Sequence, residues 1–329
     1  MRTLYAPVFF LGFVGSAVWL LDEGASLGWL PVLLLLAIGV SLLCERLWPY
    51  RERWNVSQGD GTRDVIHAGV NEALNAAGIA AIPLIALVLP DTGLWPSDWP
   101  LALQLLLALP VADLGITLVH YASHRLPLLW RLHAVHHSVT RMYGFNGLMK
   151  HPLHQMLEAL GGTLPLLLCG LPLDVAALLA FSISIQLLLQ HSNVDMRIGW
   201  LRHVFAWAPV HRLHHLKYGT TGDVNFALFF SVWDRLLGTA LHLPHYHLAD
   251  DDLGIGDFPD YPVGYSAQLR QPFRRDQPEH PPAVLPDALS RAVETDGQSL
   301  VQGLENLVRD IESNQGDLLV TLADREAFK

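Results

Sequence analysis

The chain has 329 residues, of which 51% are hydrophobic and 16% charged, and its mean hydropathy is positive. This composition is unusual for a water-soluble enzyme and typical of a membrane protein. The formal net charge is −10, but the acids gather near the C-terminus, where residues 245–329 hold 16 acidic and 7 basic residues. This distribution does not resemble the basic footprint of a nucleic-acid-binding protein. We therefore expect a membrane protein with no nucleic-acid partner.

Hydropathy predicts the membrane segments in chain order. Four apolar stretches are long enough to cross a hydrocarbon core as helices, namely residues 4–21, 27–44, 73–89 and 101–119. Two further stretches, 155–170 and 175–190, are a little short and are joined by "LPLD", which indicates a tight or re-entrant hairpin. The predicted fold class is an all-α integral membrane protein with four to six transmembrane or re-entrant helices and a helical cap.

Basic residues predict the orientation. Arginines and lysines follow the second span, the fourth span and the hairpin, whereas the intervening loops carry acids and no bases. Because basic residues are retained in the cytoplasm during insertion, these segments and the cap that they form are expected on the cytoplasmic face. Arginine greatly outnumbers lysine, which favours a bacterial inner membrane. We divide the chain into an N-terminal transmembrane pair with its loop (1–64), a central region (65–248) and an acidic cytoplasmic tail (249–329).

Three short motifs concentrate histidine in the predicted cap. They read "HYASH" at 120–124, "HAVHH" at 133–137 and "HRLHH" at 211–215. Their histidines are spaced three or four residues apart, which places side chains on one face of a helix. The fourth span runs without a break into the first motif. Pro127 then ends this helix, and a new helix can start near Leu128 and carry the second motif. Pro209 can likewise open a helix through the third motif.

The number of histidines predicts two metal ions. The three motifs supply eight imidazoles, and His191 at the end of the hairpin is a ninth candidate. One ion takes four to six ligands, so this set suits a pair. Imidazole binds iron, zinc and copper alike, but a nitrogen-rich pair at a membrane surface favours iron and oxidation of an unactivated C–H bond.

Two other functions are open to a histidine-rich membrane protein. A zinc hydrolase would need an acid beside its histidines, in the manner of "HExxH", and no motif here has one. A metal transporter would place its site near the middle of the bilayer, whereas these histidines lie at its face.

These motifs, with "DVN" at 223–225 and "WDRLLGT" at 233–239, resemble the fatty acid hydroxylase and sterol desaturase superfamily of integral membrane di-iron oxygenases. The resemblance covers about residues 105–245 and makes 65–248 the catalytic region. It implies a lipid substrate, O2, and electrons from a donor such as a cytochrome b5-like protein or a ferredoxin with its reductase. It also implies two Fe ions, although purified material could carry zinc, and a set of nine metal-ligand candidates: His120, His124, His133, His136, His137, His191, His211, His214 and His215.

The lipid, and the choice between hydroxylation and desaturation, stay open. "HPLH" at 151–154 stands where many members read "HPxE", so we assign no role to His151 or His154.

Three polar residues are candidates for orienting the ligands. Asp113 precedes His120 by seven residues and His124 by eleven, multiples that return to one helical face, so it could accept the N–H of a ligand imidazole. Asp223 and Asn225 precede an apolar segment and could either cap a helix or lie against the third motif.

Overall fold

The computed structural model describes residues 2–89, 92–274 and 280–296 of the chain. Contacts divide the chain into two units, the first made of residues 1–241 and 248–283 and the second of 242–247 and 284–329. The amphipathic pattern of the tail predicts helices near 284–295 and 298–313. Residues 287–296 of the second unit are helical, and the second predicted helix lies outside the described residues. Everything that follows concerns the first unit.

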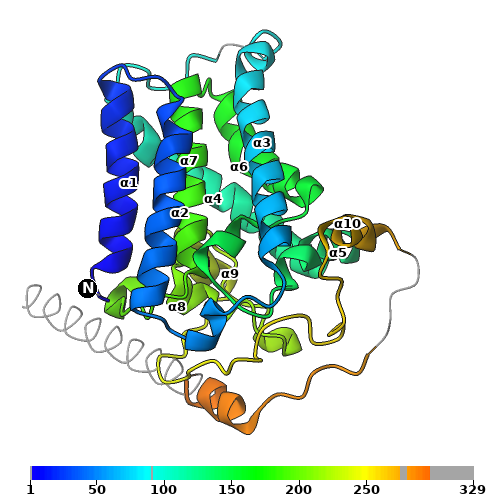
Figure 1. Ribbon diagram of the computed structural model, residues 1–329. Coiled ribbons are helices and arrows are strands. Elements are labelled where there is room, and N and C mark those ends of the chain that lie inside the picture. The colour runs from blue at the N-terminus through cyan, green and yellow to red at the C-terminus, as the bar shows by residue number, and fades with distance from the viewer. Residues whose placement is uncertain (1, 90–91, 275–279, 297–329) are drawn as a thin grey trace, which may run out of the picture. The chain divides into compact units, whose positions relative to one another are not determined.

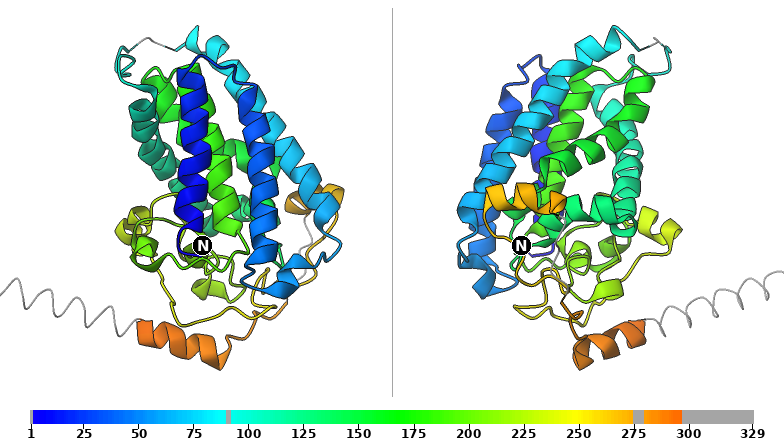
Figure 2. Two further views of the ribbon diagram at one scale, coloured as in Figure 1. Left: turned by 60° about the vertical axis from the view of Figure 1, so that its left-hand side comes forward. Right: turned by 90° about the vertical axis from the view of Figure 1, so that its right-hand side faces the viewer.

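The first unit is a bundle of long helices, with no β-strand among the residues described. Figures 1 and 2 show these helices side by side. Five are long and apolar enough to cross a membrane: α1 (Tyr5–Asp22), α2 (Trp29–Leu47), α3 (Gly61–Ala86), α4 (Leu101–Arg125) and α7 (Leu173–His191). The shorter α6 (Pro152–Leu168) forms with α7 the predicted hairpin, which is tight because four residues join the two helices. The prediction of an all-α membrane protein is confirmed.

Helix α3 begins twelve residues before the predicted span. Hydropathy misses its first turns because they contain Arg63, Asp64 and His67. All three side chains are buried in the unit, where Asp64 accepts from the guanidinium of Arg63 and from the hydroxyl of Tyr143. A segment that is polar in sequence is therefore helical because its partners come from residues far along the chain.

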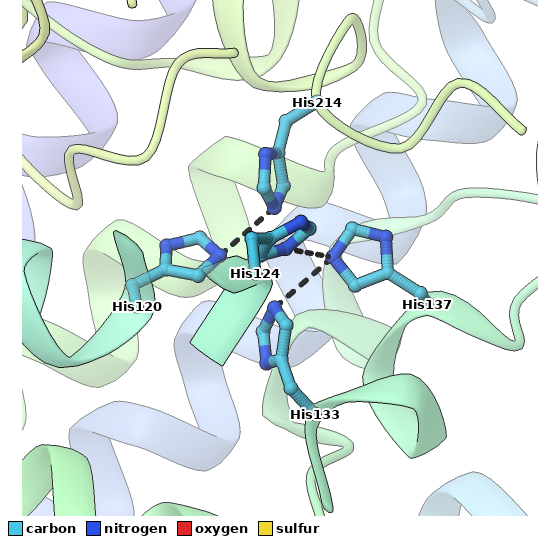
Figure 3. A group of neighbouring side chains, drawn as sticks. All are labelled: His120, His124, His133, His137 and His214. Carbon is cyan, nitrogen blue, oxygen red and sulfur yellow. Dashed lines mark hydrogen bonds between the residues drawn. The ribbon is translucent and has the colours of Figure 1, made fainter. Parts of the chain in front are cut away.

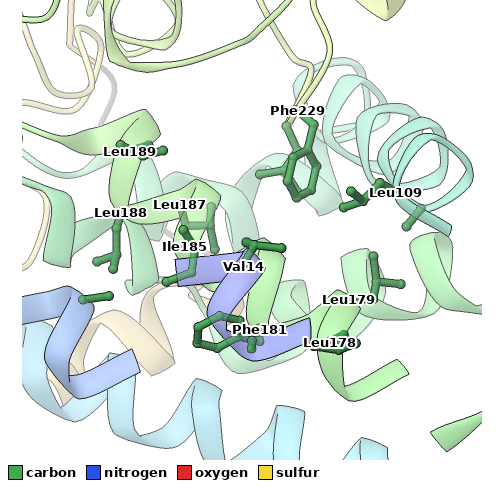
Figure 4. Packing of buried hydrophobic residues seen from close by; sticks show 14 of the residues in the cluster. Val14, Leu109, Leu178, Leu179, Phe181, Ile185, Leu187, Leu188, Leu189 and Phe229 are labelled. Atoms are coloured by element: carbon green, nitrogen blue, oxygen red, sulfur yellow. The ribbon is translucent and has the colours of Figure 1, made fainter. Parts of the chain in front are cut away.

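Helix α7 lies at the centre of the bundle, where 78% of its apolar window is buried (Figure 4). Its buried residues include Ile185, Leu188 and Leu189, which have no exposed surface. A helix enclosed on all sides is apolar around its whole circumference. Its amide side chains near the cap find backbone partners, since Gln186 and Gln190 both donate to the carbonyl of Leu228.

Glycine allows α4 and α6 to approach closely. A Cβ atom at Gly115 would stand 2.0 Å from the carbonyl oxygen of Gly161, and one at Gly161 would meet the side chain of Val119 at 2.6 Å. Small residues at a crossing let helix backbones touch inside a membrane. This contact holds the middle of α4 against the middle of α6.

Short elements gather at one end of the bundle and form the cap (Figures 1 and 2). They are α5 (Pro127–His137), α8 (Ala208–His211), α9 (Val232–Leu237), α10 (Tyr265–Arg270), and the 3-10 turns η1 (Glu52–Asn55), η2 (Gly144–Leu148), η3 (Gly199–His203), η4 (Gly219–Thr221) and η5 (Gln271–Phe273). The basic loops run through this end, and the connections 23–28 and 169–172, which carry no basic residue, lie at the other.

Two predictions about the cap helices have opposite outcomes. The break at Pro127 is confirmed, because α4 ends at Arg125 and α5 starts at Pro127. The helix predicted through the third motif is wrong, because α8 ends at His211 and tight turns carry His214 and His215. The turns still bring the backbone N–H of His214 to the carbonyl of His211, at 3.0 Å, so the side chains stay close together.

Candidate metal centre

The structure brings all nine candidate histidines into the interior of the cap. They come from α4, α5, the cap end of α7 and the segment 211–215, and their side chains cluster in two groups. The first group has five members and the second has four: His120, His124, His133, His137 and His214; then His136, His191, His211 and His215. Within each group the candidate ligand atoms lie within 4.8 Å of one another. This arrangement suits two ions, one for each group.

The motifs do not each form one ligand face, as the helical spacing had suggested. In the second motif His133 and His137 belong to the first group, whereas His136 belongs to the second. Successive residues of a helix point about 100° apart, so neighbours such as His136 and His137 belong to different groups. The third motif also divides, sending His214 to the first group and the other two to the second.

The Nε2 atoms converge within each group, and Figure 3 shows this for the first group. In the first group the Nε2 atoms of His120 and His214 are 2.8 Å apart, and those of His133 and His137 are 3.0 Å apart. In the second group Nε2 of His191 lies 3.1 Å from that of His136. Two nitrogens bound to one ion at about 2.1 Å stand about 3.0 Å apart in neighbouring octahedral positions. The spacing of the rings therefore matches ligands of a metal ion.

The opposite ring nitrogens are held by acceptors that set the tautomer. Nδ1 of five rings faces an oxygen at 2.7–3.1 Å, in the pairs His120 with Phe226 O, His124 with Asp223 Oδ1, His136 with Met149 O, His191 with Leu187 O, and His214 with Val224 O. An Nδ1–H donated to such an acceptor leaves the Nε2 lone pair free for a metal. These contacts are the outer support expected of a metal site.

Burial keeps the cap histidines neutral. Desolvation lowers the pKa of all six histidines of α5 and segment 211–215 well below the ordinary value, and the neighbouring imidazoles lower each pKa further. A metal needs the neutral imidazole, so no proton has to be displaced near pH 7. The donor set, its geometry and its protonation all fit a pair of metal ions.

Asp223 lies against a candidate ligand of the first motif, whereas the sequence had placed it at a helix cap or against the third motif. Its Oδ1 accepts from Nδ1 of His124 at 2.8 Å, and its Oδ2 faces the guanidinium of Arg125 at 3.3 Å. It does not cap a helix, because an irregular loop follows it up to α9. Asp223 can therefore orient His124 and raise the basicity of its ring.

Asp113 does not contact an imidazole, which corrects the expectation drawn from its spacing. Its carboxylate accepts from the backbone N–H groups of Leu228, Phe229 and Phe230 at 3.1, 2.9 and 2.8 Å. Seven residues along a helix return to the same face but climb about 10 Å, which is beyond the reach of one carboxylate. Asp113 thus holds the loop between the third motif and α9.

Asn225 also supports that loop and does not touch the histidines. It has a left-handed backbone, with φ 53°, and its side chain bonds the backbone of Val210 and Leu241. Its two neighbours in the chain, Val224 and Phe226, present the carbonyls that meet His214 and His120. Its contact with the site is therefore made through the adjacent backbone.

Sequence reasoning missed Asp234, Glu158 and the position of His154. Asp234 accepts from the backbone N–H groups of Phe226 and Ala227 and is therefore a second carboxylate that holds the same loop. The ring centroid of His154 lies 4.4 Å from that of His133. Glu158 forms a buried ion pair with Lys150. The four-residue spacing of His154 and Glu158 was the available signal.

His151 lies apart from both groups. It caps the start of α6, where its Nδ1 accepts from the backbone N–H of Leu153 at 3.2 Å.

Comparisons with known proteins agree with this geometry. A model of the fatty acid hydroxylase family matches residues 105–239, which contain all nine histidines. The chain is 32% identical over 284 residues to an ornithine lipid hydroxylase of Rhizobium tropici, a match that covers 84% of this chain and 85% of that protein. It is 31% identical over 150 residues to a sphinganine C4-monooxygenase of Arabidopsis thaliana, covering 43% of this chain and 55% of that protein.

Further comparisons are more limited. An alkylglycerol monooxygenase of Danio rerio is 28% identical over 145 residues, which are 44% of this chain and 31% of that protein. A model of the N-terminus of poly-beta-hydroxybutyrate polymerase matches residues 278–329, most of which lie outside the described residues. No solved structure matches the chain. The match along most of both chains with the bacterial relative, together with the family model over the histidine region, shows that this protein belongs to the fatty acid hydroxylase and sterol desaturase superfamily of membrane oxidoreductases.

Proposed function

We propose that this protein hydroxylates an unactivated C–H bond of a membrane lipid, with two iron ions held by the nine clustered histidines. The observation that carries the proposal is the division of nine buried imidazoles into groups of five and four with converging Nε2 atoms. Relatives named as hydroxylases and monooxygenases support oxygen insertion over desaturation. The balanced reaction joins R–H, O2, two electrons and two protons to give R–OH and water.

Iron is the metal that we propose for this reaction. When bound, the iron pair supplies the oxygen chemistry that no side chain can perform. An all-nitrogen set does not exclude zinc, so metal content alone is a weak criterion. The contacts give each group of residues a role. The histidines would hold the metals, and Asp223 and the carbonyls of Val224 and Phe226 orient the rings of His124, His214 and His120.

The chain also keeps the centre dry. Eight of the nine candidate ligands are buried, and the side chain of the ninth, His124, is only 3% exposed. Water exclusion protects reactive species from side reactions and strengthens the electrostatic interactions inside the site. The sequestered position therefore suits oxidation of a C–H bond.

Electrons must come from another molecule, because the described residues offer no redox centre besides the histidine groups. A small electron carrier such as a cytochrome b5-like protein or a ferredoxin fits this need. We place its contact at Trp130, whose ring centroid lies 4.9 Å from that of His124 and 5.3 Å from that of His137 and which lines a surface hollow. The basic loops at the cap end favour a cytoplasmic location for this surface, and the bacterial relative favours an inner membrane.

Lipid analysis tests the proposal. Cells that make the wild-type chain, His136→Ala, or the control His203→Ala on the exposed part of η3 are grown with and without ¹⁸O2, and their lipid extracts are compared by mass spectrometry. We expect a lipid heavier by one oxygen, labelled from ¹⁸O2, in wild type and control and its loss in His136→Ala. A product lighter by two hydrogens would instead show desaturation, and identical extracts from all three strains would refute the oxygenase proposal.

A further inference from the structure

An apolar groove runs along the membrane part of the bundle, outside the histidine groups. It encloses about 690 Å³ between α2, α3, α7 and the η2 turn. Along α3 it extends from Val65 to Ala80, a rise of about 22 Å. The acyl chains of one leaflet occupy about 15 Å, half of the hydrocarbon core. The groove is therefore long enough to take a lipid chain along its length.

The groove is open to the surrounding bilayer. Leu35 and Val65, which line its walls, are 70% and 59% exposed. Other lining residues, such as Ala177 and Phe181 of α7, are buried and form its base. Because α2, α3 and α7 are membrane-spanning helices, the molecules that can enter from the side are membrane lipids.

One acid interrupts this apolar lining. Glu72 is the single carboxylate among the described residues of the groove, and it lies seven residues, or about 10 Å, from Val65 along α3. The hydroxyl of Ser184 donates to its Oε1 at 3.0 Å, and Asn75 is a second hydrogen-bond partner. A carboxylate has about four acceptor positions, so these two contacts leave capacity for a ligand donor. Ionisable groups inside a membrane segment are costly and usually mark a functional site.

The cap end of the groove adjoins the histidine groups. Phe145 and Leu148 of η2 line the groove, while Gly147 between them packs against His191. A Cβ atom at Gly147 would stand 2.7 Å from Nδ1 of His191, so glycine permits this contact. Two residues after Gly147, Met149 offers its carbonyl to His136. A single short segment thus separates the groove from the second histidine group.

The geometry points to a binding site for one membrane lipid in this groove, where Glu72 accepts a hydrogen bond from an amide N–H or a hydroxyl in the lipid's acyl region. The inference rests on the proposed function in taking that lipid as the substrate. The expected ligands are lipids with an amide-linked or hydroxylated chain, which should bind in preference to lipids with ester linkages alone. An ester presents acceptors only and would leave Glu72 without its additional donor.

Lipid retention tests the site without requiring turnover. Purified full-length protein in detergent is loaded with ceramide, which has amide and hydroxyl donors, or with diacyl phosphatidylcholine, which has none, and the retained lipid is counted by mass spectrometry. We expect wild type to prefer ceramide by about threefold to tenfold, as one additional hydrogen bond allows. Glu72→Leu should abolish the preference and Glu72→Gln, which keeps an acceptor, should reduce it.

Two further variants locate the binding. Ala177→Trp fills the base of the groove and should reduce retention of both lipids, whereas Leu36→Ala, on the exposed face of α2 outside the lining, should change neither. Equal retention of the two lipids by wild type, or an unchanged preference in Glu72→Leu, would overturn the role of Glu72. Full retention by folded Ala177→Trp would overturn the groove as the site.

The same measurements separate this inference from the proposed function. Retention is measured without O2 or an electron donor, so a missing hydroxylated product in cells counts against the function and leaves the lipid site standing. Conversely, normal hydroxylation in cells with no ceramide preference in vitro would overturn the lipid site alone. Thermal unfolding and metal content of each variant show that the bundle and the histidine groups are intact.

Discussion

The contact between Asp223 and His124 allows a quantitative test of the metal centre. The Nδ1 to Oδ1 distance is 2.8 Å, and a hydrogen bond to a charged group contributes about 1.5–3 kcal/mol. The Asp223 side chain is 27% exposed, so solvent screening places its contribution in the lower half of that range, at about 1.5–2 kcal/mol. Asp223→Ala should therefore weaken metal binding about 10- to 30-fold, since each 1.4 kcal/mol is a factor of ten.

The assay is metal competition against a chelator of known affinity, followed by analysis of metal per protein chain. Asp223→Asn keeps an oxygen that can accept from His124 but loses the charge, so its affinity should fall between those of wild type and Asp223→Ala. Asp251→Asn, another exposed acid of the cap, is the matched control and should bind as wild type. Equal metal affinity in all four proteins would refute the argument that Asp223 acts through a ligand ring.

Three further results are expected. Asp113→Asn should destabilise the folded protein by about 2–4 kcal/mol, measured by thermal unfolding, because the amide puts donors against the backbone N–H groups of loop 228–230; an unchanged unfolding temperature would contradict this. Gly115→Val should prevent stable assembly of α4 and α6, because its Cβ would overlap the backbone of Gly161, while Gly39→Ala, with open space around it, should be tolerated in the same unfolding assay. In metal-free protein the buried histidines have a lowered pKa, so below their ordinary pKa of about 6.5 the unfolded chain binds protons that the folded chain does not. Its free energy of unfolding should therefore fall as the pH drops below about 6.5, and a flat profile in denaturant titrations between pH 7.5 and 5.5 would contradict this.

The fold class and the histidines of the centre could be predicted because their signals are local. Apolar runs of helix length are visible in any window of about twenty residues, and a triple such as His133, His136 and His137 is visible in five. His191 could be included because it follows an apolar helix whose end must lie at the membrane face. These inferences need no knowledge of which segments meet in space.

What could not be predicted depends on contacts between distant segments. The division into two groups pairs His191 with His136 and His120 with His214, which are 55 and 94 residues apart in the chain. The start of α3 depends on Tyr143, which supplies a donor to Asp64 from 79 residues away. Periodicity gives the direction of a side chain around its own helix but not its partner, which is why Asp113 was placed on the correct face and given the wrong contact.

The loop between the third motif and α9 explains why two buried carboxylates, those of Asp113 and Asp234, lie near a centre built from neutral imidazoles. Two of its carbonyls, at Val224 and Phe226, accept from His214 and His120 and so must be held in fixed positions. Irregular backbone has no regular hydrogen bonds of its own, so its buried N–H groups need acceptors from elsewhere. Asp234 supplies acceptors at the start of the loop and Asp113 at its end. The carboxylates therefore act on the rings through the backbone, and a change at Asp113 should disturb His120 without touching it.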